Sequence, residues 1–419
     1  MWRDKLMVRL VGSLRNHADL PLRVALWNGE TFTLGESPKV TIRLPASSAV
    51  KFLAPPSIAS LARGYVGGHF DVEGRLEDII EAAECLAKAG ANSAGRIRRR
   101  LRMVFHSRER DSDAIAHHYD VSNDFYRLWL DPQMVYSCAY FREDGMDLEA
   151  AQNAKLDHIF NKIMLQPDER LLDIGCGWGA LALRAARERG ASVVGVTLSK
   201  SQFDLARERV KAAGLADKVE IRLQDYRDVD GVFDKITSVG MFEHVGLANL
   251  PGYFARIRSL LRDGGLALNH GITSTDPDSA ESPYGAGEFI DEYVFPHGEL
   301  PHISLVLREM EAAGLETLDV ENLRRHYART LSCWSANYEA NAAAVRALVD
   351  ETTWRVWRIY LAGCAHAFRQ NWVAIHQVLV CKAGSEGMNR TPMTRDYMST
   401  GISNALGKGH VGTLDAPAL

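Results

Sequence analysis

The stretch from Leu171 to Ala206, LLDIGCGWGALALRAARERGASVVGVTLSKSQFDLA, constrains the fold of this chain more than any other. An apolar run ends at Asp173, a turn with three glycines follows, and helical periodicity resumes directly afterwards. This order predicts a strand, a glycine turn and a helix. Because Gly175, Gly177 and Gly179 lack a Cβ, the backbone can adopt positive φ and a ligand can approach the free N–H groups of the helix. The pattern predicts a site for a nucleotide-type cofactor.

The spacing of the glycines argues against a nicotinamide dinucleotide. It is G-x-G-x-G, whereas the dinucleotide pattern is G-x-G-x-x-G. The next apolar segment, SVVGVTL, ends near Thr197, where that pattern expects an acidic residue to hold a ribose. A tight strand-to-helix connection without a ligand is the alternative interpretation at this point, because short glycine motifs also occur in such turns.

A chain of 419 residues is long for a single core, so two domains of unequal size are expected. Hydrophobic residues make up 46% and charged residues 24%, which is typical of globular proteins, and the net charge of −4 gives no reason to expect nucleic acid as a partner. Neither a signal-peptide core nor a run of about eighteen apolar residues is present, so we expect a cytoplasmic protein. The six cysteines lack the spacing of a disulfide framework or a metal site.

The first part of the chain divides into two segments of different composition. Residues 1–90 combine alternating runs, a hairpin signal at Asn28 and Gly29, and helical pieces up to a helix stop at Gly90, which predicts a small α+β domain. Residues 91–115 contain seven arginines within fifteen residues, interleaved with apolar side chains. Such an Arg-rich linker can lie on an anionic membrane surface, where each cation contributes about 1 kcal/mol, or it can be solvated.

Residues 116–383 alternate predicted strands and helices. The strands are expected near 169–174, 193–198, 219–225, 233–240, 264–271, 315–323 and 372–380. Seven such strands predict an α/β fold with a mainly parallel, doubly wound, Rossmann-like sheet that has helices on both faces. Ligands of these sheets bind beyond the carboxyl ends of the strands. Residues 384–419 are rich in Gly, Ser and Thr without periodicity, and we expect this tail to be disordered.

Polar side chains gather at the expected carboxyl ends of two strands. Glu243 and His244 follow the apolar run KITSVGMF, and His270 closes GGLALNH. A single histidine beside an apolar strand is usually a core residue. A buried carboxylate and a buried imidazole, however, both need partners or become neutral. Position alone leaves a shared polar site and a core role equally open.

An ordered set of motifs resembles one enzyme family and covers roughly residues 116–383. In chain order the motifs are HHYDVSNDFYRLWLDPQMVYSCAYF, LLDIGCGWG, VVGVTLSKSQ, LQDYRD, SVGMFEHVG, LNHGI, IDEYVFPHGELP and AGCAHAFR. Together they resemble the cyclopropane-fatty-acyl-phospholipid synthases, which are S-adenosylmethionine-dependent methyltransferases acting on unsaturated acyl chains. The ordered set is far more specific than a lone glycine turn.

The resemblance implies an S-adenosylmethionine site at the ends of the first strands. Asp173 and the glycines would form the cofactor loop, Tyr136 and Ser137 would cover it, and Thr197 with Gln202 would hold the ribose hydroxyls. A sulfonium cofactor carries no phosphate, consistent with a turn that lacks the lysine of a P-loop. The implied cofactor-binding residues, with the last two beside the adenine, are Tyr136, Ser137, Asp173, Gly175, Gly177, Gly179, Thr197, Leu198, Ser199, Gln202, Asp225 and Tyr226.

The reaction that the resemblance implies begins with attack of a cis alkene on the sulfonium methyl group. An alkene has no proton to remove beforehand, so positioning in a dry, apolar pocket must supply most of the catalysis. Loss of a proton from the new methyl group then closes a cyclopropane ring. Family members hold bicarbonate as the base for this step, and the matching positions are Cys138, Glu243, His270, Ile272 and Tyr327. We expect Glu243 to accept the bicarbonate hydroxyl while His270, Tyr327 and backbone groups donate to its oxygens, because an unshared proton would leave two like charges together.

Two further positions in these motifs need separate comment. Cys364, in AGCAHAFR, matches a cysteine discussed as catalytic in the family, but a thiolate there would itself be alkylated. We therefore expect Cys364 to be a small pocket-lining residue. Gly271, in LNHGI, stands where relatives usually have threonine, and we expect the backbone near the implied bicarbonate to differ slightly.

The resemblance also implies a phospholipid bilayer as partner. We expect residues 1–90, a lipid-presenting domain by location and size, and the Arg-rich linker to dock on the inner face of the membrane as a peripheral contact. A homodimer is compatible with the sequence, but no pattern specifies it. Two rival functions are a related acyl-chain methyltransferase that gives a methyl-branched or methylene product, and a lipid-binding protein without catalysis, which the intact motifs disfavour.

Overall fold

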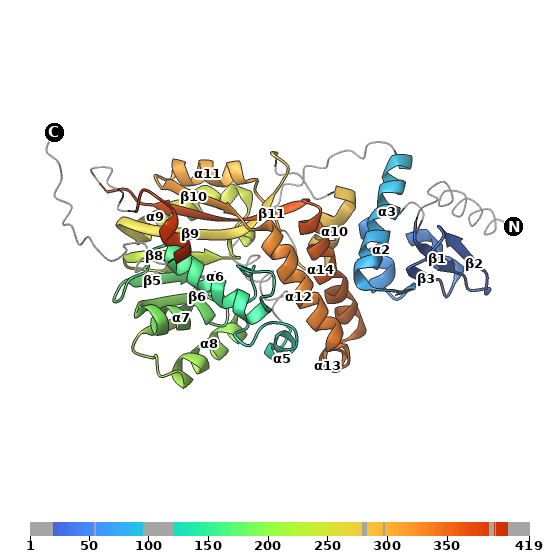
Figure 1. The fold of residues 1–419 in the computed structure, drawn as a ribbon, viewed down its shortest axis with the longest axis horizontal. Helices are drawn as coiled ribbons and strands as arrows, with labels where there is room; N and C mark the ends of the chain where they lie inside the picture. Colours follow the sequence, from blue (N-terminus) through green and yellow to red (C-terminus); the bar gives the residue numbers. More distant parts are fainter. Residues whose placement is uncertain are drawn as a thin grey trace.

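The computed structural model describes residues 20–53, 56–94, 121–278, 283–295, 298–384, 389 and 391–400. Two β-sheets organise these residues. A small sheet lies toward the N-terminal end of the molecule and a larger sheet fills the other end, with helices between them (Figure 1). Within the described residues, no helix combines the length and the apolar character that crossing a membrane requires.

The N-terminal part is an α+β unit built on a four-stranded sheet with the order β2-β1-β3-β4. Its elements are β1 (Leu22–Ala25), β2 (Thr31–Leu34), β3 (Val40–Arg43), η1 (Ser47–Phe52), α2 (Ile58–Val66), β4 (Asp71–Glu73) and α3 (Leu76–Ala94). The strands β1 and β2 are antiparallel, and Gly29 between them has a φ of 86°, as the hairpin signal predicts. Gly90 does not end α3, which continues to Ala94, because a glycine inside a helix costs only about 1 kcal/mol.

The larger sheet has seven strands in the order β10-β11-β9-β8-β5-β6-β7. The strands are β5 (Arg170–Ile174), β6 (Ser192–Thr197), β7 (Val219–Leu223), β8 (Phe233–Val239), β9 (Leu261–Ser274), β10 (Glu316–Asn322) and β11 (Val373–Cys381). β11 runs antiparallel to both of its neighbours, and the remaining pairs are parallel. The predicted doubly wound, mainly parallel sheet is confirmed.

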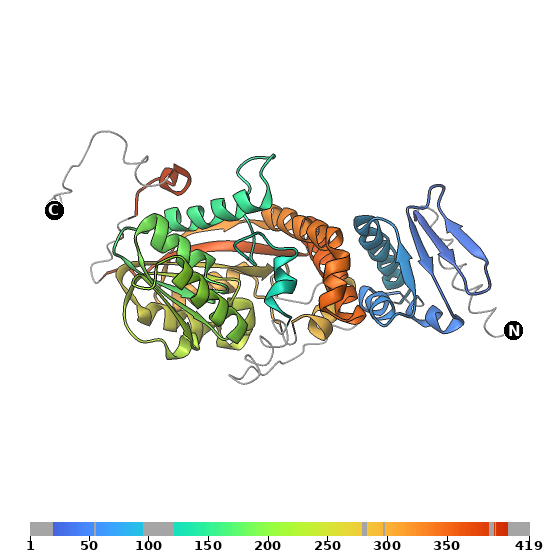
Figure 2. The same cartoon turned by 90° about the horizontal axis from the view of Figure 1, so that it is seen from below.

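Helices cover both faces of this sheet (Figure 2). The helices α6 (Leu148–Lys162), α7 (Ala180–Arg189) and α8 (Lys200–Ala212) share an apolar cluster with one face, and α9 (Leu250–Leu260) and α11 (Ile303–Ala312) share another with the opposite face. Leu268 and Ala267, neighbours on β9, enter different clusters, as the period of a strand requires. Both faces are therefore buried, which fits the apolar runs of the strands.

A third group of helices joins the two parts. It consists of α5 (Asn123–Arg127), α10 (Ala286–Tyr293), α12 (Arg324–Ala340), α13 (Ala342–Leu348) and α14 (Glu351–Arg369). α14 lies against α2 and α3, where Arg355 Nη1 donates to the Tyr65 carbonyl at 2.9 Å and His366 Nε2 lies 2.9 Å from Glu84 Oε2. One apolar cluster continues from the small sheet through these helices, so the N-terminal unit is packed onto the rest of the chain.

The tail contains structure where the sequence predicts disorder. α15 (Asp396–Thr400) packs on α6, with Tyr397 and Met398 buried. His158 Nδ1 donates to the Met398 carbonyl at 3.2 Å, and Arg395 pairs with Asp319 at 2.8 Å. The expectation of disorder from residue 384 onward is therefore wrong for this segment, because two buried side chains, a hydrogen bond and an ion pair hold it against the rest of the chain. The arginines of the linker lie outside the described residues.

Candidate active site

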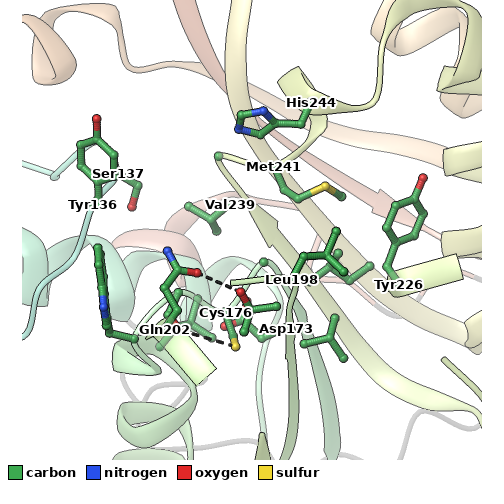
Figure 3. A pocket seen from close by; sticks show the side chains of 18 of the residues that line it. Tyr136, Ser137, Asp173, Cys176, Leu198, Gln202, Tyr226, Val239, Met241 and His244 are labelled. Carbon is green, nitrogen blue, oxygen red and sulfur yellow. Dashed lines mark hydrogen bonds between the residues drawn. The ribbon is translucent and has the colours of Figure 1, made fainter. Parts of the chain in front are cut away.

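A pocket opens at the carboxyl ends of β5, β6, β7 and β8, where doubly wound sheets bind ligands (Figure 3). All predicted cofactor-binding residues line it except Gly179 and Ser199. The residues that do so are Tyr136, Ser137, Asp173, Gly175, Gly177, Thr197, Leu198, Gln202, Asp225 and Tyr226. They come from the ends of three strands, β5, β6 and β7, and from the segment before α6, so the fold assembles positions up to about ninety residues apart in the sequence.

The glycine turn has the backbone geometry that its sequence predicts. Gly175 and Gly177 have φ of 78° and 55°, and a Cβ added to Gly177 would meet no atom within 4 Å. The N–H groups of Gly175 and Cys176, however, both donate to the Val196 carbonyl at 3.0 Å. These two N–H groups hold the turn against β6, so a ligand would contact other groups of the turn.

Gly179 and Ser199 do not line the pocket but cap the two helices that follow β5 and β6. Gly179 is the N-cap of α7 with φ of 82°, and a Cβ there would lie 3.3 Å from Ala206 Cβ on α8, so the glycine permits close packing of the two helices. Ser199 is the N-cap of α8 and accepts from the Gln202 N–H. Both residues belong to motifs that line the pocket, and for that reason the sequence assigned them to it.

Thr197 and Gln202, expected to hold a ribose, are joined to each other. Thr197 Oγ1 donates to Gln202 Oε1 at 2.9 Å, and both residues line the pocket, where Figure 3 shows Gln202. Further along the wall, the Asp225 carboxylate forms a two-point ion pair with Arg227, with Nε–Oδ1 and Nη2–Oδ2 distances of 2.9 and 2.7 Å. The guanidinium compensates the charge of Asp225, so this side of the pocket is close to neutral.

Asp173 and Ser137 bring polar groups into the buried end of the pocket. Asp173 accepts from Thr237 Oγ1 at 2.8 Å, and burial raises the pKa of its carboxyl to about 6. Ser137 Oγ accepts from Lys155 Nζ at 2.8 Å. Lys155, on α6, also lines the pocket and is 1% exposed. A buried ammonium thus stands beside a pocket predicted to hold a cofactor with a charged amino-acid end.

Glu243 lies in η3 (Phe242–His244), just beyond the end of β8. Its Oε1 accepts from the Ile272 N–H at 2.7 Å, whereas its buried Oε2 has no hydrogen-bond partner in the described part of the chain. Burial raises the pKa of Glu243 to about 7, and the Ile272 N–H works against that rise. The carboxyl can therefore change its protonation state near neutral pH.

His270 is fully buried on β9, two residues before Ile272 and on the same side of the strand. Its Nδ1 lies 3.1 Å from the Gln377 amide nitrogen, an assignment that makes Nδ1 the acceptor and Nε2 the donor. Nε2 has no hydrogen-bond partner among the residues that the structure describes. Burial, and then the cation of Lys155, lower the pKa of His270 well below its ordinary value, so the ring is neutral.

The other four predicted catalytic residues lie in or against the largest apolar cluster. Cys138 is fully buried with Sγ 3.3 Å from the Ala139 carbonyl, and Tyr327 packs with its ring 4.7 Å from that of Phe368. Ile272 and Cys364 are partly buried against the same cluster. Burial raises the pKa of Cys138 and raises that of Cys364 to about 12, so neither thiol ionises near neutral pH.

None of these six catalytic candidates lines the pocket itself, but Glu243 is directly behind its wall. Met241, His244 and Val245, which flank Glu243 in sequence, all line it, and Figure 3 shows the first two. Sequence reasoning missed Lys155 and Trp178 as pocket residues. Trp178 stood inside the glycine motif GCGWG and could have been found there. Lys155 carried no signal, since a lysine on a helix is usually exposed.

Comparison with known proteins places the chain among lipid-modifying enzymes. The family model described as mycolic acid cyclopropane synthetase matches residues 106–378, and one described as a domain of unknown function matches residues 10–93. A probable fatty acid methyltransferase of Pseudomonas putida is 49% identical over 381 residues, which cover 90% of this chain and 96% of that protein. The cyclopropane-fatty-acyl-phospholipid synthase of Escherichia coli K12 is 40% identical over 271 residues, with 65% and 68% covered.

Solved structures agree with these matches. The mycolic acid cyclopropane synthase CmaA1, crystallised with SAH and CTAB, superposes with a TM-score of 0.62 at 37% identity, covering 65% of this chain and 98% of that one. The cyclopropane synthase MmaA2 of Mycobacterium tuberculosis superposes with a TM-score of 0.63 at 34% identity, with 65% and 98% covered.

Proposed function

The chain belongs to the mycolic acid cyclopropane synthetase family, and from this premise we propose that it transfers a methyl group from S-adenosylmethionine to a cis double bond of a phospholipid acyl chain and closes a cyclopropane ring. Methyl transfer from S-adenosylmethionine is the coarser part of this statement and follows from the family and the methyltransferase fold. The substrate class and the ring closure are the proposal.

The observation that carries the proposal is two buried polar atoms without hydrogen-bond partners, one of them on Glu243, whose neighbours in sequence line the pocket. Glu243 Oε2 and His270 Nε2 are both buried without a partner in the described part of the chain, although a buried polar atom without a hydrogen bond costs about 1–3 kcal/mol. Glu243 Oε2 is an acceptor when the carboxyl is ionised, and His270 Nε2 is a donor in the assigned tautomer. This donor and acceptor set fits a small oxyanion that shares a proton, as bicarbonate does.

When bound, bicarbonate would supply the base that takes a proton from the newly transferred methyl group. The residues of this chain would hold it: Glu243 would accept from its hydroxyl, and His270 and Tyr327 would donate to its oxygens. The Glu243 carboxylate also stays next to Ile272 N–H, which anchors one oxygen and leaves the other for this contact. The overall change balances as loss of the sulfonium methyl group, gain of one methylene by the alkene, and release of one proton.

The aromatic residues around Tyr136 would provide the dry surroundings that such a reaction needs. Tyr136 lies 5.4 Å from Trp129 and 5.3 Å from Trp334, ring centre to ring centre, and Trp129 and Trp334 are fully buried. Apolar walls exclude water that would trap a carbocation, and aromatic faces stabilise positive charge. No described feature requires a protein nucleophile, consistent with an alkene as the attacking group.

The proposal is tested by incubating the protein with S-adenosylmethionine and vesicles of unsaturated phospholipid, followed by mass spectrometry of the acyl chains. Ring closure adds one methylene. A saturated methyl branch adds one methylene and two hydrogens, and this second candidate is favoured by the similarity to the probable fatty acid methyltransferase of Pseudomonas putida. A methylene product has the same mass as the ring, and the upfield cyclopropane signals in a proton spectrum separate the two. Unchanged acyl chains in the presence of cofactor binding would contradict both functions and favour a lipid-binding role.

We further propose that residues 1–90 and the Arg-rich linker dock the enzyme on the cytoplasmic face of a bilayer. The support is the charge of the linker and the packing of the N-terminal unit on α14, the helix that carries Cys364. Co-sedimentation with anionic vesicles should fall strongly between low and high salt, because screening weakens charge attraction. Binding that salt leaves unchanged would contradict this proposal.

A further inference from the structure

Gly271 on β9 is covered by the ring of Phe242. A Cβ built on Gly271 would lie 3.1 Å from Phe242 Cζ and would overlap Cε1 and Cδ1. Phe242 is 1% exposed and belongs to the apolar cluster under α9, so its ring has no free space to move into. Gly271 has no positive φ, so the backbone itself would accept a larger residue. The ring, rather than the backbone, makes glycine necessary here.

Glu243 and Ile272, the residues directly after Phe242 and Gly271, form a hydrogen bond with each other. In the ladder between β8 and β9, Gly240 N–H donates to the His270 carbonyl at 2.8 Å. In a parallel ladder that continued, the next donor, Ile272 N–H, would donate to the carbonyl of residue 240. Instead the chain turns away into η3, and Glu243 Oε1 takes the place of that carbonyl at 2.7 Å. The carboxylate therefore completes the sheet edge at the point where β8 ends.

We propose that Gly271 and Phe242 form a positioning pair that holds the Glu243 carboxylate at the Ile272 N–H with its second oxygen available for the reaction. Phe242 directly precedes Glu243, and Gly271 directly precedes Ile272. The packing of Phe242 on Gly271 therefore fixes the hydrogen bond between Glu243 and Ile272. A side chain at position 271 would push the ring, and η3 with it, away from β9. This inference rests on the proposed function for the role of Glu243 and adds the device that sets its geometry.

The test is Gly271→Ala, which adds one methyl group where the ring lies. The matched control is Gly252→Ala on α9, where an added Cβ meets no atom within 4 Å. We expect Gly271→Ala to lower turnover about 100-fold, because misplacement of a reacting group by about 1 Å has effects of that size. Affinity for S-adenosylmethionine, measured by calorimetry, should stay within about twofold of the parent, and Gly252→Ala should match the parent in both measurements.

A second readout needs neither turnover nor cofactor. The infrared difference between each protein and the same protein carrying Glu243→Gln isolates the Glu243 carboxyl, and its band is followed against pH. The Ile272 N–H lowers the pKa of Glu243, so losing that bond in Gly271→Ala should raise the pKa further. Tyr253, on α9, is a titratable neighbour of Glu243. Burial raises the pKa of its phenol, and the charge of Glu243 raises it further, so the phenol keeps its proton while Glu243 titrates.

Phe242→Leu provides a second variant for the case that Gly271→Ala does not fold. It removes the ring without adding a clash, and the Glu243 titration should shift in the same direction. Combining Phe242→Leu with Gly271→Ala should restore part of the turnover lost by Gly271→Ala alone, because the smaller side chain makes room for the methyl group. A folded Gly271→Ala with the parent's turnover and titration would overturn the proposal, and so would an unshifted titration in Phe242→Leu. If the parent gives no lipid product, the proposed function fails while the infrared titration still decides the positioning role.

Discussion

Lys155 Nζ donates a hydrogen bond of 2.8 Å to Ser137 Oγ in the wall of the pocket. Because the serine oxygen accepts from an ammonium, its own hydrogen can be donated to a ligand. Burial lowers the pKa of Lys155 to about 8, although Asp131 and Asp173 oppose this shift. The pair is therefore a buried donor group in the pocket lining that carries positive charge while Lys155 is protonated.

Lys155→Met should weaken binding of S-adenosylmethionine by about tenfold, since the donor geometry of Ser137 and the nearby charge are both lost. In the parent, Lys155 is charged below pH 8 and loses its proton above it, so affinity should fall as the pH rises through about 8. Calorimetric titration across this range checks both statements. Lys200→Met, at an exposed lysine on α8, is the control. Parent-like affinity in Lys155→Met would show that the ammonium does not contribute to the site.

Glu243→Gln should fold, bind the cofactor and lose most of its turnover, because an amide cannot accept a proton as a carboxylate does. The pKa of Glu243 is raised to about 7 by burial, so the ionised form gains population as the pH rises through that value. Turnover of the parent should increase over the same interval, and residual turnover of the variant should not. Steady-state assays against pH check this, with Glu220→Gln on the exposed strand β7 as control. A variant as active as the parent would remove Glu243 from the reaction.

Cys364→Ser should keep most of the activity. Burial raises the pKa of the Cys364 thiol to about 12, so no thiolate is present near neutral pH, and the proposed chemistry gives the sulfur no bond to make. Product formation by the purified, folded variant is the measurement. Complete loss of activity with an unchanged melting temperature would mean that Cys364 takes part in the chemistry.

Lys162→Met should lower the free energy of unfolding by about 3 kcal/mol, because it removes a buried cation and leaves Asp319 and Glu321 with only Arg395 and His158 as partners. Lys162 is 1% exposed and pairs with Asp319 at 2.8 Å and Glu321 at 2.6 Å. Urea unfolding measures the loss. The exposed pair Lys218 and Asp168 supplies the control, since Lys218→Met should cost less than about 1 kcal/mol.

The ion pairs of Glu321 with His158 and Lys162 should make the free energy of unfolding depend on pH under acidic conditions. His158 and Lys162 overcome the effect of burial and lower the pKa of Glu321 to about 2. A carboxyl with a lowered pKa stabilises the folded state above its ordinary pKa, and that contribution disappears as the pH falls toward about 2. Stability of the parent should therefore drop through this interval, whereas Glu321→Gln should lose the corresponding part of the slope. Identical slopes would show that Glu321 is not the responsible group.

Features written in local sequence could be predicted well. The glycine turn, the succession of strands along the chain and most predicted pocket residues follow from short motifs. In such motifs, neighbouring positions together set the backbone geometry and the contacts to a ligand. The same locality explains why Gly179 and Ser199 were placed in the pocket: they stand inside the motifs but cap helices α7 and α8. Within a motif, the sequence does not separate contact residues from residues that shape the turn.

Features that depend on tertiary packing could not be predicted. Lys155 looks like a surface lysine until α6 places it under the segment that carries Ser137. Tyr397 and Met398 sit in a polar, glycine-rich tail, and only the surface of α6 makes their burial possible. Phe242 lies close to Gly271 because the end of β8 pairs with the carboxyl-terminal part of β9, and no spacing in the sequence indicates this pairing.

If a base removes a proton from the transferred methyl group, a cofactor with a fully deuterated methyl group must lose one deuterium during the reaction. The protein is incubated with this cofactor and unsaturated phospholipid vesicles, and the deuterium content of the modified acyl chains is measured by mass spectrometry. Ring closure predicts a product that has lost one deuterium and shows the signals of the two cyclopropane methine protons, since the ring methylene itself then carries deuterium. A product that retains every deuterium of the methyl group would contradict ring closure, since the carbocation would then have been quenched without deprotonation.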